Sequence, residues 1–159
     1  MSVIIIVDDK TASSATLARG LKLTIEEITN GECSVELMEG AIITEALPIL
    51  KKAVDRKHAE GFTVAGFLFD LVDETRNIPD AGALLLDEVK SDPDLKSIPV
   101  VIYTSKNRGF SMAELMKRGA KTAISRQTVD KTADDLGKQT LDAFEIPYRG
   151  SRTGSTGVY

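Results

Sequence analysis

The sequence predicts a single α/β domain, doubly wound, with five parallel strands and helices on both faces of the sheet. Three apolar runs, at residues 3–7, 62–71 and 99–103, are continuous and contain many β-branched or aromatic residues. Runs of this kind are typical of strands that are buried on both faces. Segments with helical spacing separate them, and such alternation favours a parallel sheet.

The first half of the chain contains two predicted helices and an edge strand. Apolar residues recur every three or four positions over residues 11–28, which predicts a helix with one buried face. Residues 32–38 alternate between apolar and polar side chains, as in a half-exposed strand at the edge of a sheet. A second helix is expected over 44–59, with Pro48 in its first turn, where a missing N–H is tolerated.

The second half continues the same alternation. Helices are expected over 81–90 and 129–144, and a short strand over 121–125. Ser111, followed three residues later by Glu114, forms a capping box that predicts a short helix over 111–118. We expect the domain to span residues 1–146. Residues 147–159 contain many Gly, Ser and Thr and few apolar side chains, which predicts a flexible tail.

Composition limits the classes of function. The 159 residues carry a net charge of -4, which argues against a nucleic-acid-binding face. The single cysteine, Cys33, cannot form an internal disulfide, so a reducing compartment is expected. The chain shows neither a signal peptide nor a stretch of transmembrane length. We therefore expect a cytoplasmic protein that binds neither nucleic acid nor a membrane.

Polar side chains follow the predicted strands where each strand ends. Asp8 and Asp9 follow the first strand, Asp70 ends the third, and Thr104 and Arg126 follow the last two. Ligands of open parallel sheets bind beyond these carboxyl ends, so the five side chains are expected to share one site.

Three converging carboxylates repel one another, which predicts that a cation accompanies them. Mg²⁺ prefers oxygen ligands and is commonly shared with phosphate. A carboxylate can then accept a phosphoryl group, while a hydroxyl and a basic side chain stabilise its charge. The alternative is that Asp8 and Asp9 merely cap the first helix and Asp70 caps the third.

The same segments resemble the receiver domains of two-component response regulators. The resemblance covers about residues 2–145. The motifs that carry it are residues 4–9 (IIIVDD), 67–70 (FLFD), 98–105 (IPVVIYTS) and 119–120 (GA). It implies a flavodoxin-like sheet with strand order 2-1-3-4-5.

The resemblance also implies a role for each site residue. Asp70 matches the phosphoryl-accepting aspartate, and Asp8 and Asp9 match the acidic pair that holds Mg²⁺ or a similar divalent cation such as Mn²⁺. Val72 would contribute its backbone carbonyl to the metal together with Asp70. Thr104 matches the hydroxyl residue that meets the phosphoryl group, and the small Ser105 beside it keeps the site accessible.

Two positions depart from the pattern of the family. Receivers usually carry a lysine and then a proline near the end of the fifth strand, whereas this chain has Arg126 and Gln127. Arginine keeps the positive charge and can bind phosphate, but it is longer and planar. The aromatic switch position is Ala123, which has no ring to reorient. The loop after Asp70 is also longer than usual.

These features lead to a stand-alone receiver as the main functional hypothesis. It would accept a phosphoryl group in a phosphorelay from a sensor histidine kinase or a phosphotransfer protein and act on a downstream protein target. Beyond self-phosphorylation and autodephosphorylation it would not be an enzyme, and homodimerisation is left open. The alternative is a degenerate receiver in which Arg126 pairs permanently with Asp70, so that the domain is a phosphorylation-independent adaptor.

Overall fold

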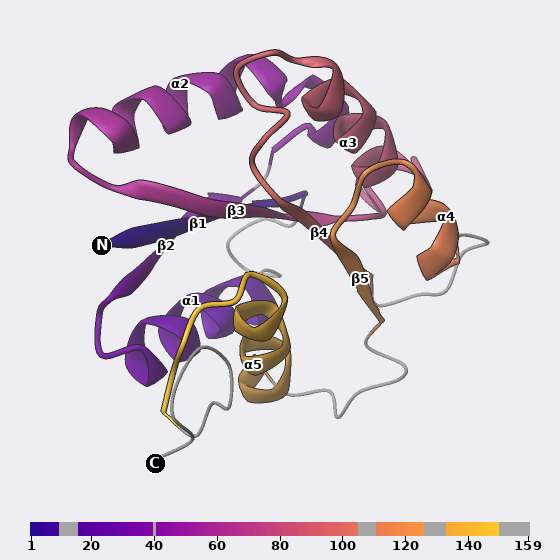
Figure 1. Cartoon of the computed structure of the whole chain (residues 1–159). Coiled ribbons are helices and arrows are strands. Elements are labelled where there is room, and N and C mark those ends of the chain that lie inside the picture. Colours follow the sequence, from indigo (N-terminus) through magenta and orange to yellow (C-terminus); the bar gives the residue numbers. More distant parts are fainter. Residues whose placement is uncertain (10–15, 40, 105–110, 126–132, 150–159) are drawn as a thin grey trace.

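The computed structural model describes residues 1–9, 16–39, 41–104, 111–125 and 133–149 (Figure 1). Within these ranges one five-stranded sheet has the order β2-β1-β3-β4-β5, and every neighbouring pair is parallel. The predicted fold class and strand order are therefore confirmed. The strands are β1 Ser2–Asp8, β2 Cys33–Glu39, β3 Thr63–Asp70, β4 Val100–Thr104 and β5 Thr122–Ser125.

Helices cover both faces of the sheet. Figure 1 shows α1 and α5 on one face and α2, α3 and α4 on the other. The helices are α1 Thr16–Ile28, α2 Leu47–Ala59, α3 Ala81–Ser91, α4 Met112–Lys117 and α5 Ala133–Ala143, with a 3₁₀ turn, η1, at Ile43–Glu45. Residues 11–15 and 129–132 of the predicted first and last helices lie outside the described ranges.

The central strands are buried on both faces because successive side chains of a strand point to opposite sides. Val3, Ile5 and Val7 pack into the core beneath α2 and α3, whereas Ile4 and Ile6 pack beneath α1 and α5. All five side chains are fully buried. This arrangement explains why the apolar run is continuous, and it confirms the prediction of a doubly covered strand.

The second helix begins later than predicted. The sequence suggested a start near Thr44, but η1 occupies that region and α2 begins at Leu47. Pro48 is the physical reason, since a helix that continued back to Thr44 would press the Thr44 carbonyl against the proline ring. Pro48 itself lies in the first turn, as expected.

Two local features fix the positions of α4 and α5. The side chain of Ser111 accepts a hydrogen bond from the Glu114 N–H at 3.1 Å. This is the bond that the N-cap side chain makes in the predicted capping box. On the opposite face, the Phe144 ring, just after α5, lies on Gly66 of β3. A Cβ at position 66 would stand 2.1 Å from the ring, so only glycine leaves room for it there.

The chain beyond α5 returns to the α1 side of the molecule. Tyr148 is buried in the core beneath α1 and α5, and the Arg149 N–H donates to the Ile28 carbonyl at 3.0 Å. Residues 150–159 lie outside the described ranges, so the domain boundary at residue 146 stays a prediction.

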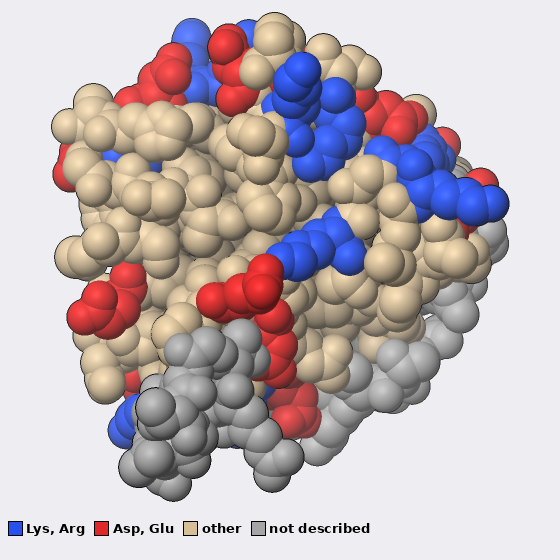
Figure 2. All heavy atoms as spheres, in the orientation of Figure 1, with Lys and Arg blue, Asp and Glu red and all other residues tan. Residues whose placement is uncertain are grey.

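The face seen in Figure 2 has mixed charge, with basic and acidic side chains interspersed over α2, α3 and α4. Ion pairs join charged side chains of these helices and the segments beside them, because Arg118 pairs with Asp87 and Lys51 with Asp92. Within the described residues, no helix is both long enough and apolar enough to cross a membrane.

Candidate functional site

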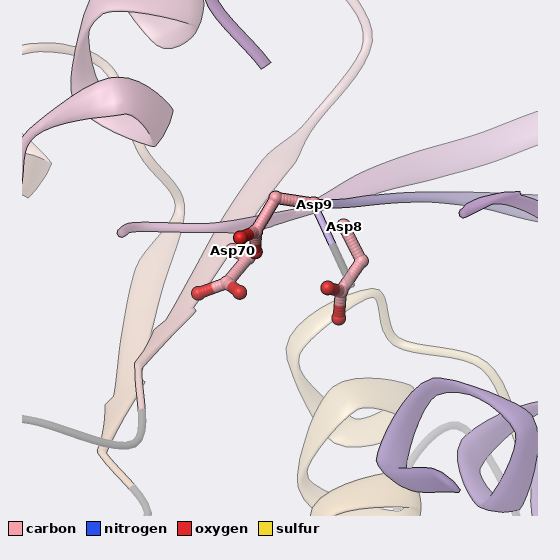
Figure 3. A group of neighbouring side chains, drawn as sticks. All are labelled: Asp8, Asp9 and Asp70. Atoms are coloured by element: carbon pink, nitrogen blue, oxygen red, sulfur yellow. The ribbon is translucent and has the colours of Figure 1, made fainter. Parts of the chain in front are cut away.

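The carboxyl ends of β1 and β3 bring three aspartates together. Asp8 is the last residue of β1, Asp9 follows it, and Asp70 is the last residue of β3. One carboxylate oxygen of each lies within 4.8 Å of the others. Figure 3 shows the three side chains projecting from these two strand ends. The convergence expected from the sequence is therefore present in the structure.

All three aspartates are withdrawn from solvent, with exposed fractions of 3% for Asp8, 1% for Asp9 and 8% for Asp70. Burial, followed by the charges of Asp8 and Asp9, raises the pKa of the Asp70 carboxyl from 3.8 to about 9. Mutual repulsion and desolvation thus act in the same direction. A ligand that carries positive charge would relieve both.

Each aspartate also accepts hydrogen bonds that fix its side chain. The Val72 N–H donates to Oδ1 of Asp70 at 3.3 Å. The N–H and the hydroxyl of Thr75 both donate to Oδ2 of Asp9, each at 3.1 Å. Donors of this kind stabilise carboxylates and hold them in one orientation.

The loop after Asp70 folds back on itself and presents Thr75 to the site. Asp73 and Ile78 form an antiparallel bridge, with N–H to carbonyl distances of 2.9 and 2.8 Å. Asp73 is fully buried and accepts hydrogen bonds from the backbone and the guanidinium of Arg76 at 3.0 and 3.1 Å. The additional residues of this loop therefore form a small hairpin over the acidic cluster.

The start of α3 packs directly against the backbone of Asp70. The Gly82 N–H donates to the Leu71 carbonyl at 2.9 Å, and a Cβ at position 82 would stand 2.4 Å from the carbonyl oxygen of Asp70. Asp80 occupies the N-cap position of α3. The alternative that Asp70 caps this helix is therefore wrong.

The other predicted site residues have different outcomes. Thr104 ends β4, the strand next to β3, and is buried with 9% exposed. Val72 is buried beside Asp70, but a role for its carbonyl stays a prediction. Ser105 and Arg126 lie outside the described residues, and so does any contact of theirs with the cluster.

Two residues that contact the cluster were not predicted from the sequence. The sequence predicts Tyr103 only as part of an apolar strand, yet its hydroxyl donates to Oδ2 of Asp8. Thr75, which donates to Asp9, lies in the loop after Asp70. The signal for Tyr103 was available, because a tyrosine in a fully buried strand needs a partner for its hydroxyl. No comparable signal marked Thr75, since its contact depends on how the loop folds.

Comparison with solved structures supports the fold independently. The phosphorylated cyanobacterial phytochrome response regulator RcpA has a TM-score of 0.63 and 19% identity, over 97% of this chain and 99% of that one. The signal receiver domain of the response regulator NarL from Mycobacterium tuberculosis has a TM-score of 0.61 and 17% identity, over 90% and 95%. The Mn²⁺-bound form of response regulator Rcp1 has a TM-score of 0.59 and 18% identity, over 98% and 100%.

The chain therefore has the fold of a response-regulator receiver domain, as the resemblance implied. No protein-family model matches the sequence, and no curated protein matches it either. Identities below one fifth show a shared fold alone, so the chemistry is argued from the residues of this chain.

Proposed function

We propose that this protein is a response regulator that binds a divalent cation at its acidic cluster and accepts a phosphoryl group on Asp70. The observation that carries the proposal is the convergence of three buried carboxylates within 4.8 Å at the carboxyl ends of β1 and β3. Buried carboxylates that lie this close together are unfavourable unless a cation accompanies them. The segment that leads into α1 lies outside the described residues, so capping of α1 by Asp8 and Asp9 is not tested.

The donor set fits a hard divalent cation. Asp8, Asp9 and Asp70 offer carboxylate oxygens, and we propose that the Val72 carbonyl is the further ligand. Mg²⁺ is the cation that we favour, with Mn²⁺ as a substitute. The solved structure of Rcp1 was obtained in an Mn²⁺-bound form. A bound cation would neutralise negative charge on the oxygens of the transferring group.

Asp70 is the acceptor that we propose. One of its carboxylate oxygens attacks the phosphorus of the donor, the bond between phosphorus and the donor's leaving atom breaks, and its electron pair leaves with the donor. The buried hydroxyl of Thr104, at the end of the adjacent strand, would hydrogen-bond the phosphoryl oxygens. Arg126 would supply the positive charge, and Ser105 would leave room for the donor.

We propose a signalling role for this chemistry. The phosphoryl donor would be a sensor histidine kinase or a phosphotransfer protein, and the output would be contact with a downstream protein target. Receiver domains are generally signalling domains rather than enzymes. We propose a reducing, cytoplasmic setting, because the lone Cys33 cannot form an internal disulfide.

Incubation with acetyl phosphate and Mg²⁺, followed by intact-mass analysis, tests the proposal. We expect one phosphoryl adduct on the wild type and none on Asp70→Asn. A wild type that stays unmodified under conditions that label a known receiver would contradict the proposal. An adduct that persists in Asp70→Asn would contradict the choice of acceptor.

The alternative adaptor function rests on the departures at Arg126, which lies outside the described residues, and at Ala123. Ala123 lies on β5, packs half-buried against the core on the α3 side, and has no ring that could move. Titration with Mg²⁺ separates the two functions. A permanent pair between Arg126 and Asp70 predicts poor cation binding, which substitution of Arg126 with glutamine would restore. The signalling function predicts binding in the wild type.

A further inference from the structure

Tyr103 is a buried polar residue that the proposed chemistry does not yet use. It lies in β4, directly before Thr104, and only 3% of it is exposed. Its ring packs in the core beneath α1 and α5, among Ile4, Ile6 and Leu68. Packing alone would be served equally well by phenylalanine, because a buried hydroxyl without a partner is unfavourable. The hydroxyl therefore calls for an explanation of its own.

The partner of this hydroxyl is the acidic cluster, because it donates a hydrogen bond to Oδ2 of Asp8. Figure 3 shows the Asp8 carboxylate directed toward the α1 and α5 side of the sheet, away from Asp70. The contact thus accounts for the orientation of Asp8. One carboxylate oxygen of Asp8 still lies within 4.8 Å of ligand atoms of Asp9 and Asp70.

The backbone of Tyr103 holds a second member of the cluster. Tyr103 is the register partner of Asp70 across β3 and β4, and its carbonyl accepts a hydrogen bond from the Leu71 N–H at 2.9 Å. The side chain of one residue therefore holds Asp8 while its main chain holds the strand end that carries Asp70. These two aspartates come from different strands, so their spacing depends on such a link.

We propose that Tyr103 is a positioning residue for the divalent cation site, and that its hydroxyl sets the orientation of the Asp8 carboxylate. This inference rests on the proposed function, since it assigns a role toward the same cation. Outer partners that orient metal ligands commonly change metal affinity by about 10- to 100-fold when they are removed. Tyr103→Phe deletes the hydroxyl and keeps the ring.

Mn²⁺ titration, read from the electron paramagnetic resonance signal of the free ion, tests the inference. We expect Tyr103→Phe to bind Mn²⁺ about tenfold more weakly than the wild type. Tyr148→Phe is the matched control, because Tyr148 is buried in the same core cluster and lies after α5, far along the chain from the aspartates. It is expected to keep the affinity of the wild type within twofold or so.

A measurement on the wild type covers the case in which Tyr103→Phe does not fold. The chain has three tyrosines, so labelling with [¹³Cζ]tyrosine gives three resonances. The Tyr103 resonance is expected to shift on saturation with Mg²⁺, because the hydrogen-bonded carboxylate gains a cation, whereas that of Tyr148 stays in place. A Tyr103 resonance that does not move overturns the inference.

The outcomes separate the inference from the proposed function. A wild type that binds no Mn²⁺ refutes both. A wild type that binds Mn²⁺, together with a folded Tyr103→Phe that binds it equally well or more tightly, refutes the positioning role and leaves the proposed function standing. Weaker binding in Tyr103→Phe with unchanged binding in Tyr148→Phe supports the inference.

Discussion

Replacement of Asp70 with asparagine is expected to stabilise the cation-free protein at neutral pH. In the folded protein, burial and the neighbouring charges of Asp8 and Asp9 raise the pKa of the Asp70 carboxyl from 3.8 to about 9. The folded state therefore holds a proton that the unfolded chain releases. This contribution to stability is complete below pH 3.8 and is lost as the pH rises toward 9.

The size of the effect follows from the same pKa values. Neutral pH lies about three pH units above 3.8, and each unit corresponds to about 1.36 kcal/mol, so Asp70 costs the folded state about 4 kcal/mol at pH 7. Asparagine carries no charge and retains an oxygen to accept the Val72 N–H. For a domain of this size, 4 kcal/mol corresponds to an increase in Tm of about 8 to 16 °C.

Urea denaturation in EDTA, monitored by circular dichroism, measures the difference. The advantage of Asp70→Asn is expected to grow by about 1.4 kcal/mol per pH unit between pH 5 and pH 8. Asp55→Asn makes the same chemical change at an exposed position on α2 and is the matched control. The reasoning is refuted if Asp70→Asn is no more stable than the wild type at pH 7, or if its advantage does not depend on pH.

Three further predictions concern the surroundings of the site and the core. Gly82→Ala places a Cβ 2.4 Å from the Asp70 carbonyl oxygen, so it should destabilise the fold by about 1 to 3 kcal/mol. It should also slow acetyl phosphate labelling, and normal stability and labelling would contradict this. Thr75→Val removes the hydroxyl that donates to Asp9 and should weaken Mn²⁺ binding about tenfold in calorimetry, whereas Thr75→Ser should preserve it. Burial raises the pKa of the Cys33 thiol to about 11, so iodoacetamide at pH 8 should label it only after unfolding in urea, and rapid labelling of the native protein would disprove its burial.

The strands and the acidic cluster could be predicted because both depend on local patterns. A continuous apolar run identifies a strand covered on both faces, and the acid that ends it lies by geometry at the carboxyl edge of the sheet. Asp8 and Asp70 were found in this way, and the structure places both of them there. The edge position of β2 followed from its alternation of polar and apolar residues.

The hydrogen-bond partners of the cluster could not be predicted in the same way. The contact between Thr75 and Asp9 joins residues 66 positions apart and depends on the hairpin in the loop after β3. The contact between Tyr103 and Asp8 joins residues 95 positions apart and crosses β3, so it depends on the registers of β1 with β3 and of β3 with β4. Apolar and polar patterns locate an element, but they do not say which side chains meet across it.

The start of α2 could have been predicted more accurately from the position of Pro48. Pro48 was correctly placed in the first turn, and the same residue limits how far the helix can extend backwards. The residues before α2 instead form a 3₁₀ turn at Ile43–Glu45, which is wound more tightly than an α-helix. Counting back from the proline would have placed the boundary correctly.

The packing of the Phe144 ring against Gly66 constrains how this sequence can diverge during evolution. A methyl group at position 66 would overlap the ring, and a smaller residue at position 144 would leave a cavity above glycine. Neither position can therefore change freely while the other is kept. Among descendants of this chain, enlargement at 66 should accompany reduction at 144, so that the two residues covary although they lie 78 positions apart in the sequence.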